Sequence, residues 1–174
     1  EQKYAVEYII GAVNEERYKG ILLYGVTGSG KTEVYLRAAE SAIAAGGTVL
    51  LEVPEIALTN QMVSYFADYF GDKVVFEQDS AAKPYQVAPH LHSNLSKGER
   101  YNNRQRIANE ESSIIIGSRS ALFMPFKNLK LIIVDEEYDS SYKQTETPRY
   151  NGRDVAKVMA VIYNCPIVLG AATP

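Results

Sequence analysis

The feature that most constrains the fold is a phosphate-loop spacing directly behind an apolar run. In the stretch LLYGVTGSGKTEV, Gly25 is followed by four residues and then by Gly30, Lys31 and Thr32. Glycines let successive backbone N–H groups point inward and form a concave anion site, which a Cβ would obstruct. The preceding run is typical of a strand and the following segment of a helix, whose positive end faces the loop. The sequence therefore predicts a strand, a P-loop and a helix that bind a nucleoside triphosphate.

Each part of this loop has a predicted role. Lys31 is expected to reach the β and γ phosphates of ATP, and the Thr32 hydroxyl to ligate Mg²⁺. The predicted cofactor-binding residues are Gly25, Val26, Thr27, Gly28, Ser29, Gly30, Lys31 and Thr32. The alternative is a glycine-rich turn that binds nothing, and a chance match of this spacing has a probability of about one percent.

Composition limits the other classes of function. The chain of 174 residues, 46% of them hydrophobic, suffices for one core and predicts a single domain. A formal net charge of -3 gives no overall positive field, so nucleic-acid binding has to rest on local features. The lone cysteine, Cys165, leaves no cysteine cluster, so we expect no zinc. No apolar run is long enough for a bilayer and no basic leader is present, which predicts a cytoplasmic protein without a membrane partner.

Apolar runs alternate with helical periodicity along the chain. This pattern is typical of an α/β fold, in which a mostly parallel sheet has helices on both faces. The expected helices cover residues 2–13, 31–44, 57–70, 97–109 and 152–163. The expected strands cover residues 21–25, 48–53, 73–76, 88–92, 112–117, 129–135 and 166–170. Residues 77–87, EQDSAAKPYQV, are expected to form a surface loop or local insertion, because charged residues, proline and small residues stand where a tight connection would suffice.

A second motif, LKLIIVDEEYDSS, favours hydrolysis over the other chemistries of P-loop proteins. Its apolar run is typical of a buried strand whose carboxyl end faces the phosphates, where parallel sheets bind ligands. Asp135 at that end suits the Mg²⁺ shell, and Glu136 suits polarisation of the attacking water. Lys31, Asp135 and Glu136 are therefore the predicted catalytic residues. The alternative is an ordinary acidic turn after a strand.

Further motifs give a resemblance to one family of helicases. The chain resembles the bacterial primosomal protein N′ (PriA) family of superfamily 2 DNA helicases in the order of these segments: VTGSGKTEVYL, VPEIALT, LHSNLSKGER, GSRSALF, LIIVDEEYDSSYKQ, PRYNGRDVA and LGAATP. The resemblance covers nearly the whole chain except residues 77–87. It implies a RecA-like P-loop NTPase lobe over residues 1–174, the first of two lobes, with ATP between the lobes and single-stranded DNA across their tops. It also implies 3′ to 5′ translocation in replication restart, with forked DNA, primosome proteins and single-strand-binding proteins as partners.

The resemblance also assigns roles to residues outside the loop and the acidic pair. It implies that Gln2 reads adenine in a Q-like motif. The residues implied for DNA binding or for coupling are Pro54, Thr59, Ser118, Arg119, Ser120, Tyr138, Tyr142, Lys143, Arg149, Tyr150 and Thr173. Serine, threonine and arginine side chains just after strand ends suit phosphate contacts that read no bases, although a surface ion pair is the alternative for Arg119.

The loop YDSSYKQTETPRY contains three tyrosines and two basic residues, and it has no strand or helix pattern. Aromatic rings interleaved with cations suit stacking on unpaired bases. The family resemblance points the same way, because its members carry an aromatic-rich loop here that couples DNA binding to hydrolysis. A tyrosine-anchored surface loop is an equal alternative.

The chain departs from the family in segments that relay the nucleotide state to DNA. The family tends to have His at the position of Tyr138, Ser at that of Ala171, and His-Ala at those of Asn151 and Gly152. We therefore expect nucleotide binding with weakened DNA-stimulated turnover. The chain stops at Pro174 without residues for a second lobe or an arginine finger, so we expect these residues alone to bind ATP or ADP weakly and to hydrolyse it slowly.

Two other functions stay open on the sequence. A P-loop kinase would need an arginine-rich lid, for which residues 95–106, LSKGERYNNRQR, are a candidate. A nucleotide-binding interaction module that is deficient in turnover would explain the substitutions at Tyr138 and Ala171. Phosphate transfer rather than phosphate release would identify the kinase, and binding without turnover would identify the module.

Overall fold

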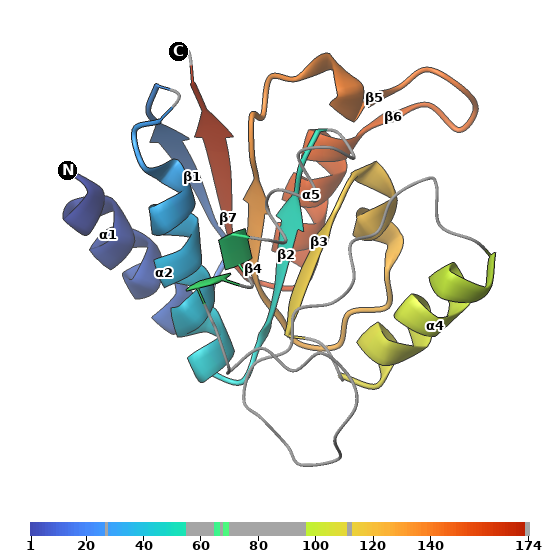
Figure 1. Ribbon diagram of the computed structural model, residues 1–174, viewed down its shortest axis with the longest axis horizontal. Helices are drawn as coiled ribbons and strands as arrows, with labels where there is room; N and C mark the ends of the chain where they lie inside the picture. The colour runs from blue at the N-terminus through green and yellow to red at the C-terminus, as the bar shows by residue number, and fades with distance from the viewer. Residues whose placement is uncertain (27, 55–64, 67, 70–96, 111–112, 173–174) are drawn as a thin grey trace.

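Five parallel strands form one sheet at the centre of the part of the chain that the structure describes (Figure 1). The computed structural model describes residues 1–26, 28–54, 65–66, 68–69, 97–110 and 113–172. The strands are β1 (Lys19–Tyr24), β2 (Thr48–Glu52), β3 (Ile114–Gly117), β4 (Leu129–Val134) and β7 (Pro166–Ala171). Their order is β1-β7-β4-β2-β3, and each neighbouring pair is parallel. All of them therefore end at one edge, which we call the carboxyl edge.

Helices cover both faces of this sheet. They are α1 (Gln2–Asn14), α2 (Lys31–Ala44), α4 (Lys97–Ala108) and α5 (Gly152–Ile162), with two 3-10 turns, η2 (Arg119–Phe123) and η3 (Ser140–Tyr142). One core cluster joins α1 and α2 to the sheet, and a second joins α5, η2 and Ile107 of α4 to the opposite face. The predicted α/β fold, with a parallel sheet between two layers of helices, is confirmed.

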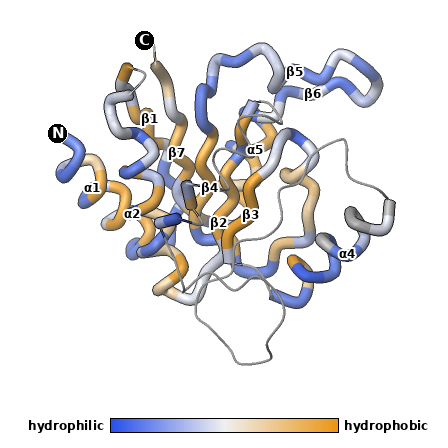
Figure 2. Tube along the Cα trace, viewed as in Figure 1, coloured by the Kyte–Doolittle hydropathy of each residue, from blue (hydrophilic) through white to orange (hydrophobic). Residues whose placement is uncertain are grey.

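Strands β2, β3, β4 and β7 are largely buried because they are apolar on both faces, whereas the edge strand β1 is mostly exposed or half-buried. Leu51 and Ile133 belong to the cluster on the α1 and α2 side, whereas Leu50 and Ile132 belong to the cluster on the α5 side. Figure 2 shows the strands as strongly hydrophobic and α4 as largely hydrophilic. Burying each such aliphatic side chain stabilises the fold by about 1.5–3 kcal/mol. The sheet is thus a rigid base for the loops at its carboxyl edge.

Most predicted elements agree with the described structure to within about two residues, the usual uncertainty of element ends. This holds for the helices expected over 2–13, 31–44, 97–109 and 152–163, and for the strands expected over 21–25, 48–53, 112–117, 129–135 and 166–170. From the helix expected over 57–70, the buried Phe66 and the partly buried Tyr69 pack on the α1 and α2 side. The strands expected over 73–76 and 88–92 and the loop over 77–87 lie outside the described residues.

One expectation about local structure is wrong. The loop after β4 was expected to lack strands, but it contains β5 (Lys143–Gln144) and β6 (Tyr150–Asn151), which pair antiparallel. Strands of this length cannot show an alternating pattern, which takes about four residues to recognise. We call the segment from β5 to β6 the hairpin.

None of the helices in the described ranges has both the length and the apolar character that crossing a bilayer requires.

Candidate active site

The P-loop lies at the carboxyl edge between β1 and α2. Gly28 and Gly30 have left-handed backbone conformations, with φ of 77° and 87°, which residues with a side chain adopt only with strain. A Cβ on Gly25 would lie 2.5 Å from Ser29 Oγ, so this position also requires glycine. Gly30 is the N-cap of α2, and no side chain caps that helix end. Four of the predicted loop residues thus form a tight turn that leads into a helix N-terminus, while Thr27 lies outside the described residues.

Lys31 folds back over this loop. Its ammonium donates hydrogen bonds to the carbonyl oxygens of Gly25 at 2.5 Å and Val26 at 3.5 Å. The same Nζ lies 4.0 Å from Glu136 Oε1, and the Lys31 side chain is only 10% exposed. The structure therefore brings the P-loop lysine and the acidic motif together at one place.

Asp135 directly follows β4 on the α2 side of the carboxyl edge. The Tyr35 hydroxyl, from the second turn of α2, donates a 2.9 Å hydrogen bond to Asp135 Oδ1. Burial raises the pKa of Asp135, the Tyr35 hydrogen bond and the Lys31 charge lower it, and the neighbouring Glu136 charge raises it. A Cβ on Gly170 of β7 would overlap the Tyr35 hydroxyl, so glycine makes room for this pair. Sequence analysis missed Tyr35, although it lies one helical turn after Lys31 and so on the same side of α2.

Glu136 has a left-handed backbone, with φ of 48°, which is unusual for a residue with a long side chain. The Tyr138 hydroxyl donates a 2.5 Å hydrogen bond to Glu136 Oε2. This bond, followed by desolvation and nearby negative charge, raises the pKa of Tyr138 to about 12. The next residue, Glu137, is tied to α5 by a 2.8 Å ion pair with Arg153. The turn after β4 is thus stabilised by a hydrogen bond within it and by an ion pair to α5.

The groups gathered here suit a nucleotide triphosphate and a divalent cation. An ammonium and an uncapped helix N-terminus attract phosphate oxygens. The Asp135 carboxyl accepts hydrogen bonds from the Tyr35 hydroxyl and the Glu136 backbone, and a carboxylate has further oxygen lone pairs that suit a cation such as Mg²⁺. Thr32 lies in the first turn of α2, next to Lys31, and offers a hydroxyl. The donor set therefore fits the predicted cofactors.

Gln2 also contacts this site. Its side-chain amide donates a 2.7 Å hydrogen bond to the carbonyl oxygen of Ser29. A Cβ on Gly30 would overlap the same amide nitrogen, so the Gln2 side chain lies against the loop. The first turn of α1 is thereby attached to the P-loop, and adenine reading by Gln2 stays a prediction.

The residues predicted to contact DNA lie farther along the carboxyl edge. Ser118, Arg119 and Ser120 follow β3, where Ser118 is the N-cap of η2. Pro54 follows β2, and its carbonyl oxygen accepts a 3.0 Å hydrogen bond from Ser141 Oγ. Thr59 and Thr173 lie outside the described residues.

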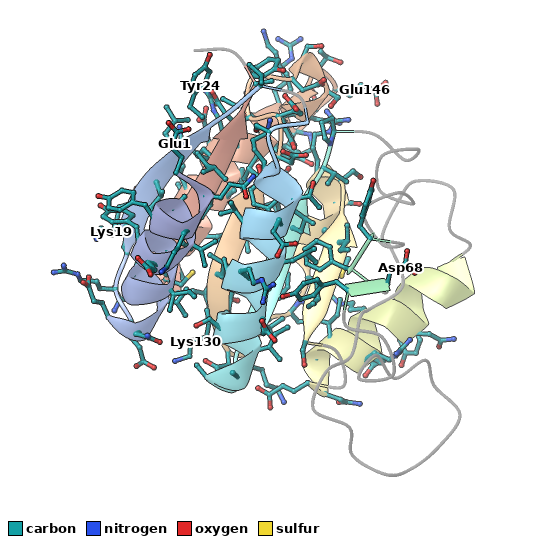
Figure 3. The ribbon with its side chains drawn as sticks, turned by 60° about the vertical axis from the view of Figure 1, so that its left-hand side comes forward. Glu1, Lys19, Tyr24, Asp68, Lys130 and Glu146 are labelled. Atoms are coloured by element: carbon teal, nitrogen blue, oxygen red, sulfur yellow. The ribbon has the colours of Figure 1, made fainter. Side chains whose placement is uncertain are left out.

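The hairpin brings three of the predicted DNA-contact residues around one hollow. Lys143, Arg149 and Tyr150 line a space of about 520 Å³ together with Gln144, Thr145 and Asn151. The Tyr150 ring packs edge-to-face against Phe123 of η2, with centroids 5.3 Å apart. Figure 3 shows Glu146 of the hairpin and Tyr24 of β1 at the same end of the molecule, with Lys130 at the opposite end. The hairpin therefore lies at the same end of the molecule as the P-loop, which follows Tyr24.

Tyr142 anchors its loop in the core, which is the alternative to base stacking for this residue. Its side chain is only 1% exposed and belongs to the core cluster on the α5 side. Its hydroxyl donates to the backbone carbonyl oxygens of Asp135 and, at 3.2 Å, of Glu52. The ring is buried because η3 folds it back between the ends of β2 and β4. A coupling role for Tyr142 through these strand ends stays a prediction.

The arginine-rich segment considered as a kinase lid lies far from the P-loop. It forms much of α4, which lies at the β3 end of the sheet, whereas the P-loop follows β1 at the other end (Figure 1). Arg104 and Arg106 are therefore not placed over the candidate nucleotide site.

Two curated relatives match essentially this whole chain. The replication restart protein PriA of Bacillus subtilis is 45% identical over 174 residues, which are 100% of this chain and 20% of that protein. The replication restart protein PriA of Synechocystis is 46% identical over 158 residues, which are 90% of this chain and 17% of that protein. The chain thus spans about a fifth of the length of these relatives. The resemblance that the motifs predict is confirmed.

Solved structures give the same fold. RecG bound to a three-way DNA junction has a TM-score of 0.72 at 23% identity, over 99% of this chain and 20% of that chain. The Hef helicase domain of Pyrococcus furiosus has a TM-score of 0.61 at 19% identity, over 97% of this chain and 32% of that chain. At these identities the likeness establishes the fold alone, which is that of a RecA-like helicase lobe. The family model of the DEAD/DEAH box helicases matches residues 1–174. The chain therefore belongs to the DEAD/DEAH box helicase family.

Proposed function

We propose that this chain is the ATP-binding lobe of a DNA helicase that acts in replication restart. In this proposal it is the first of two lobes, and ATP hydrolysis drives translocation along single-stranded DNA in the 3′ to 5′ direction. Membership of the helicase family and the name of the two relatives described above support it. Because the chain spans a fifth of those relatives, the activity and the partners belong to a longer protein in this proposal.

The observation that carries the proposal is the 4.0 Å distance between Lys31 Nζ and Glu136 Oε1. Lys31, our proposed phosphate-binding lysine, thus lies beside Glu136, our proposed base, and Asp135 is adjacent in sequence. In our assignment Lys31 holds the β and γ phosphates, and Thr32 and Asp135 hold Mg²⁺, which when bound neutralises phosphate charge. Gln2 recognises adenine, and the P-loop amides surround the phosphates.

The chemistry assigned to this chain's own residues is a proton transfer and a release of contacts. Glu136 accepts the proton of the attacking water, and the hydrogen bond that Oε2 accepts from the Tyr138 hydroxyl makes this carboxylate a weaker base until that bond is released. Lys31 exchanges the carbonyl oxygens of Gly25 and Val26 for phosphate oxygens. Nucleotide binding would thus replace the hydrogen bonds of Lys31 to the loop and release the hydrogen bond of Tyr138 to Glu136.

The DNA part of the proposal is supported by the carboxyl edge. Arg119 and the hairpin residues Lys143 and Arg149 offer cations for the phosphate backbone, and Tyr150 offers a ring for base stacking. Single-stranded or forked DNA is the proposed substrate. Primosome and single-strand-binding proteins are proposed partners of the longer protein.

Nucleotide affinity tests the proposal. Lys31→Ala and Asp135→Asn should each weaken binding of a fluorescent ATP analogue at least about tenfold in the presence of Mg²⁺. The Asp135→Asn effect should vanish when Mg²⁺ is replaced by EDTA, because its role is to hold the cation. Lys157→Ala, which removes a lysine of α5 from an exposed pair with Asp154, is the matched control. Equal affinity in Lys31→Ala and the control would refute the assigned site.

A second candidate function is a nucleotide-binding module that is deficient in turnover. The hydrogen bond from Tyr138 to Glu136 favours it, because the hydroxyl occupies one carboxylate oxygen of the candidate base. The family tends to have His at the position of Tyr138. In a two-lobe protein that contains this chain, Tyr138→His should raise the stimulation of ATPase rate by single-stranded DNA. Equal stimulation in the parent and the variant would show that Tyr138 does not restrain turnover, and the helicase assignment would stand.

We also propose that the 174 residues alone hydrolyse ATP slowly, since an arginine supplied from elsewhere contributes about 10³–10⁵ in rate in other P-loop enzymes.

A further inference from the structure

The Tyr35 hydroxyl is a buried polar group that the assigned chemistry does not use. Tyr35 is 1% exposed and Asp135 is 9% exposed. The hydroxyl donates its 2.9 Å hydrogen bond to one particular oxygen of Asp135, Oδ1. Tyr35 follows Lys31 by four residues in α2, so both side chains lie on the side of the helix that faces the site. One oxygen of a proposed cation ligand is thus already bonded from within the helix that follows the P-loop.

Gly170 leaves the space in which this contact forms. It belongs to β7, which lies between β1 and β4 in the sheet. A Cβ on Gly170 would overlap the Tyr35 hydroxyl and would lie 3.0 Å from Asp135 Oδ1. The chain around Gly170 is itself fixed, because its carbonyl oxygen accepts a 2.8 Å hydrogen bond from the Glu137 N–H and that of Ala171 accepts one of 3.0 Å from the Gly25 N–H. The hydroxyl therefore occupies a space that the end of β7 provides.

This contact makes the two oxygens of the Asp135 carboxyl unequal. Oδ1 shares its lone pairs with a buried donor, and the backbone of Glu136 also donates to the same carboxyl. Mg²⁺ demands an octahedral shell, keeps several waters and takes few protein ligands, whereas Ca²⁺ takes six to eight oxygens and often binds both oxygens of one carboxylate. A carboxylate with one oxygen held by a fixed hydroxyl suits Mg²⁺ better than Ca²⁺.

We propose that Tyr35 is a positioning residue that makes the cation site selective for Mg²⁺ over Ca²⁺. By holding Oδ1, Tyr35 leaves Asp135 to bind the cation through its other oxygen alone. The inference rests on the proposed function, in which Asp135 holds the cation that accompanies ATP. Gly170 contributes indirectly, because it leaves room for the hydroxyl.

A purely structural role for Tyr35 has a different consequence. A buried carboxyl needs hydrogen-bond donors whether or not it binds a cation, and losing one would disturb the site for every cation alike. The affinities with Mg²⁺ and with Ca²⁺ would then fall by the same factor. The quotient of the two affinities therefore separates a role in selectivity from a role in stability alone.

Nucleotide binding with each cation tests the selectivity. A fluorescent ATP analogue should bind the parent chain more tightly with Mg²⁺ than with Ca²⁺. In Tyr35→Phe the quotient of the two affinities should fall at least about threefold, because both oxygens of Asp135 become available to the larger cation. Tyr69→Phe is the matched control, since its hydroxyl donates to Glu40 of α2 outside the site, and it should keep the parent's quotient. An unchanged quotient in Tyr35→Phe would overturn the proposal.

Infrared spectroscopy tests the ligation itself, and in the parent chain it needs no variant at Tyr35. The splitting between the antisymmetric and symmetric carboxylate stretches is wide when one oxygen binds a cation and narrow when both do. With aspartate labelled by ¹³C at its carboxyl, the band that ATP and Ca²⁺ induce in the parent but not in Asp135→Asn belongs to Asp135. Its splitting should be wide in the parent and narrow in Tyr35→Phe. A narrow splitting in the parent would contradict the proposal.

Asp135→Asn separates this inference from the proposed function on which it rests. If this variant binds the analogue as the parent does with either cation, the assigned cation site fails and the selectivity fails with it. If the variant loses its dependence on Mg²⁺ while Tyr35→Phe keeps the parent's quotient, the cation site stands and only the role of Tyr35 is refuted.

Discussion

At the scale of single residues, the candidate active site depends on side chains that touch the predicted catalytic groups. Tyr35 donates to the Asp135 carboxyl from within α2, and this bond opposes the effect of burial on the pKa of Asp135. Sequence motifs point to Lys31, Asp135 and Glu136 because they carry the chemistry. They do not reveal Tyr35, since a tyrosine on a buried helix face is indistinguishable from an ordinary core residue.

Removing the Tyr35 hydroxyl should therefore weaken both stability and cation binding. Tyr35→Phe leaves a buried carboxylate oxygen unpaired, and a hydrogen bond to a charged group contributes about 1.5–3 kcal/mol to the free energy of unfolding. Urea denaturation should show a loss of that size, and the Mg²⁺-dependent part of ATP affinity should fall. Tyr69→Phe removes a hydroxyl that bonds the partly buried Glu40 outside the site, and it should cost less than about 1 kcal/mol. Equal losses in the two variants would show that Tyr35 has no special role.

Gly152 and Glu52 should be energetically coupled. Gly152→Ala forces a Cβ into the Glu52 carboxyl and should lower the free energy of unfolding by about 1–3 kcal/mol. Glu52→Ala removes the obstacle, so the double variant should recover part of that loss, with a coupling energy of about 0.5–3 kcal/mol. Gly11→Ala, in α1 with nothing within 4 Å of its added Cβ, should instead be neutral or stabilising. Additive losses at positions 52 and 152 would disprove the steric account.

At the scale of elements, long apolar runs and helical periodicity predict the sheet and its flanking helices. The run LKLIIV forms β4, which is buried except at the half-buried Lys130, and KTEVYLRAAESAIA forms α2 over the predicted residues. The hairpin could not be predicted, because its strands are too short for a pattern and are held by contacts such as Tyr150 on Phe123. The burial of Tyr142 and Glu52 also depends on contacts between segments that are distant in sequence.

The hairpin should contribute to DNA affinity through charge. Lys143→Ala and Arg149→Ala should each weaken binding of single-stranded DNA, since each loses a cation at the hollow. A plot of log affinity against log salt concentration should lose about 0.7 of its slope for each phosphate contact removed. Lys3→Ala, which removes an exposed lysine of α1, should leave the slope unchanged. The same slope in all the variants would exclude the hairpin from the DNA surface.

At the scale of the whole molecule, the sheet separates two sets of groups that share its carboxyl edge. The P-loop, Asp135 and Tyr35 lie on the α2 side, whereas Glu52 lies on the α5 side with Gly152. Tyr142 joins them, because its hydroxyl bonds the carbonyl oxygens at the ends of β2 and β4. The coupling role predicted for Tyr142 would act through these adjacent strand ends.

The central claim is that the P-loop and the acidic pair form one site for a nucleotide and its cation. Paramagnetic broadening tests it most directly, with Mn²⁺ and ATP added to the isotope-labelled chain. We predict that the amide signals of Gly30, Thr32 and Asp135 broaden together, while that of Glu16, at the opposite edge beside Lys130, stays sharp. Broadening at only one of the two motifs, or equally at Glu16, would contradict the account.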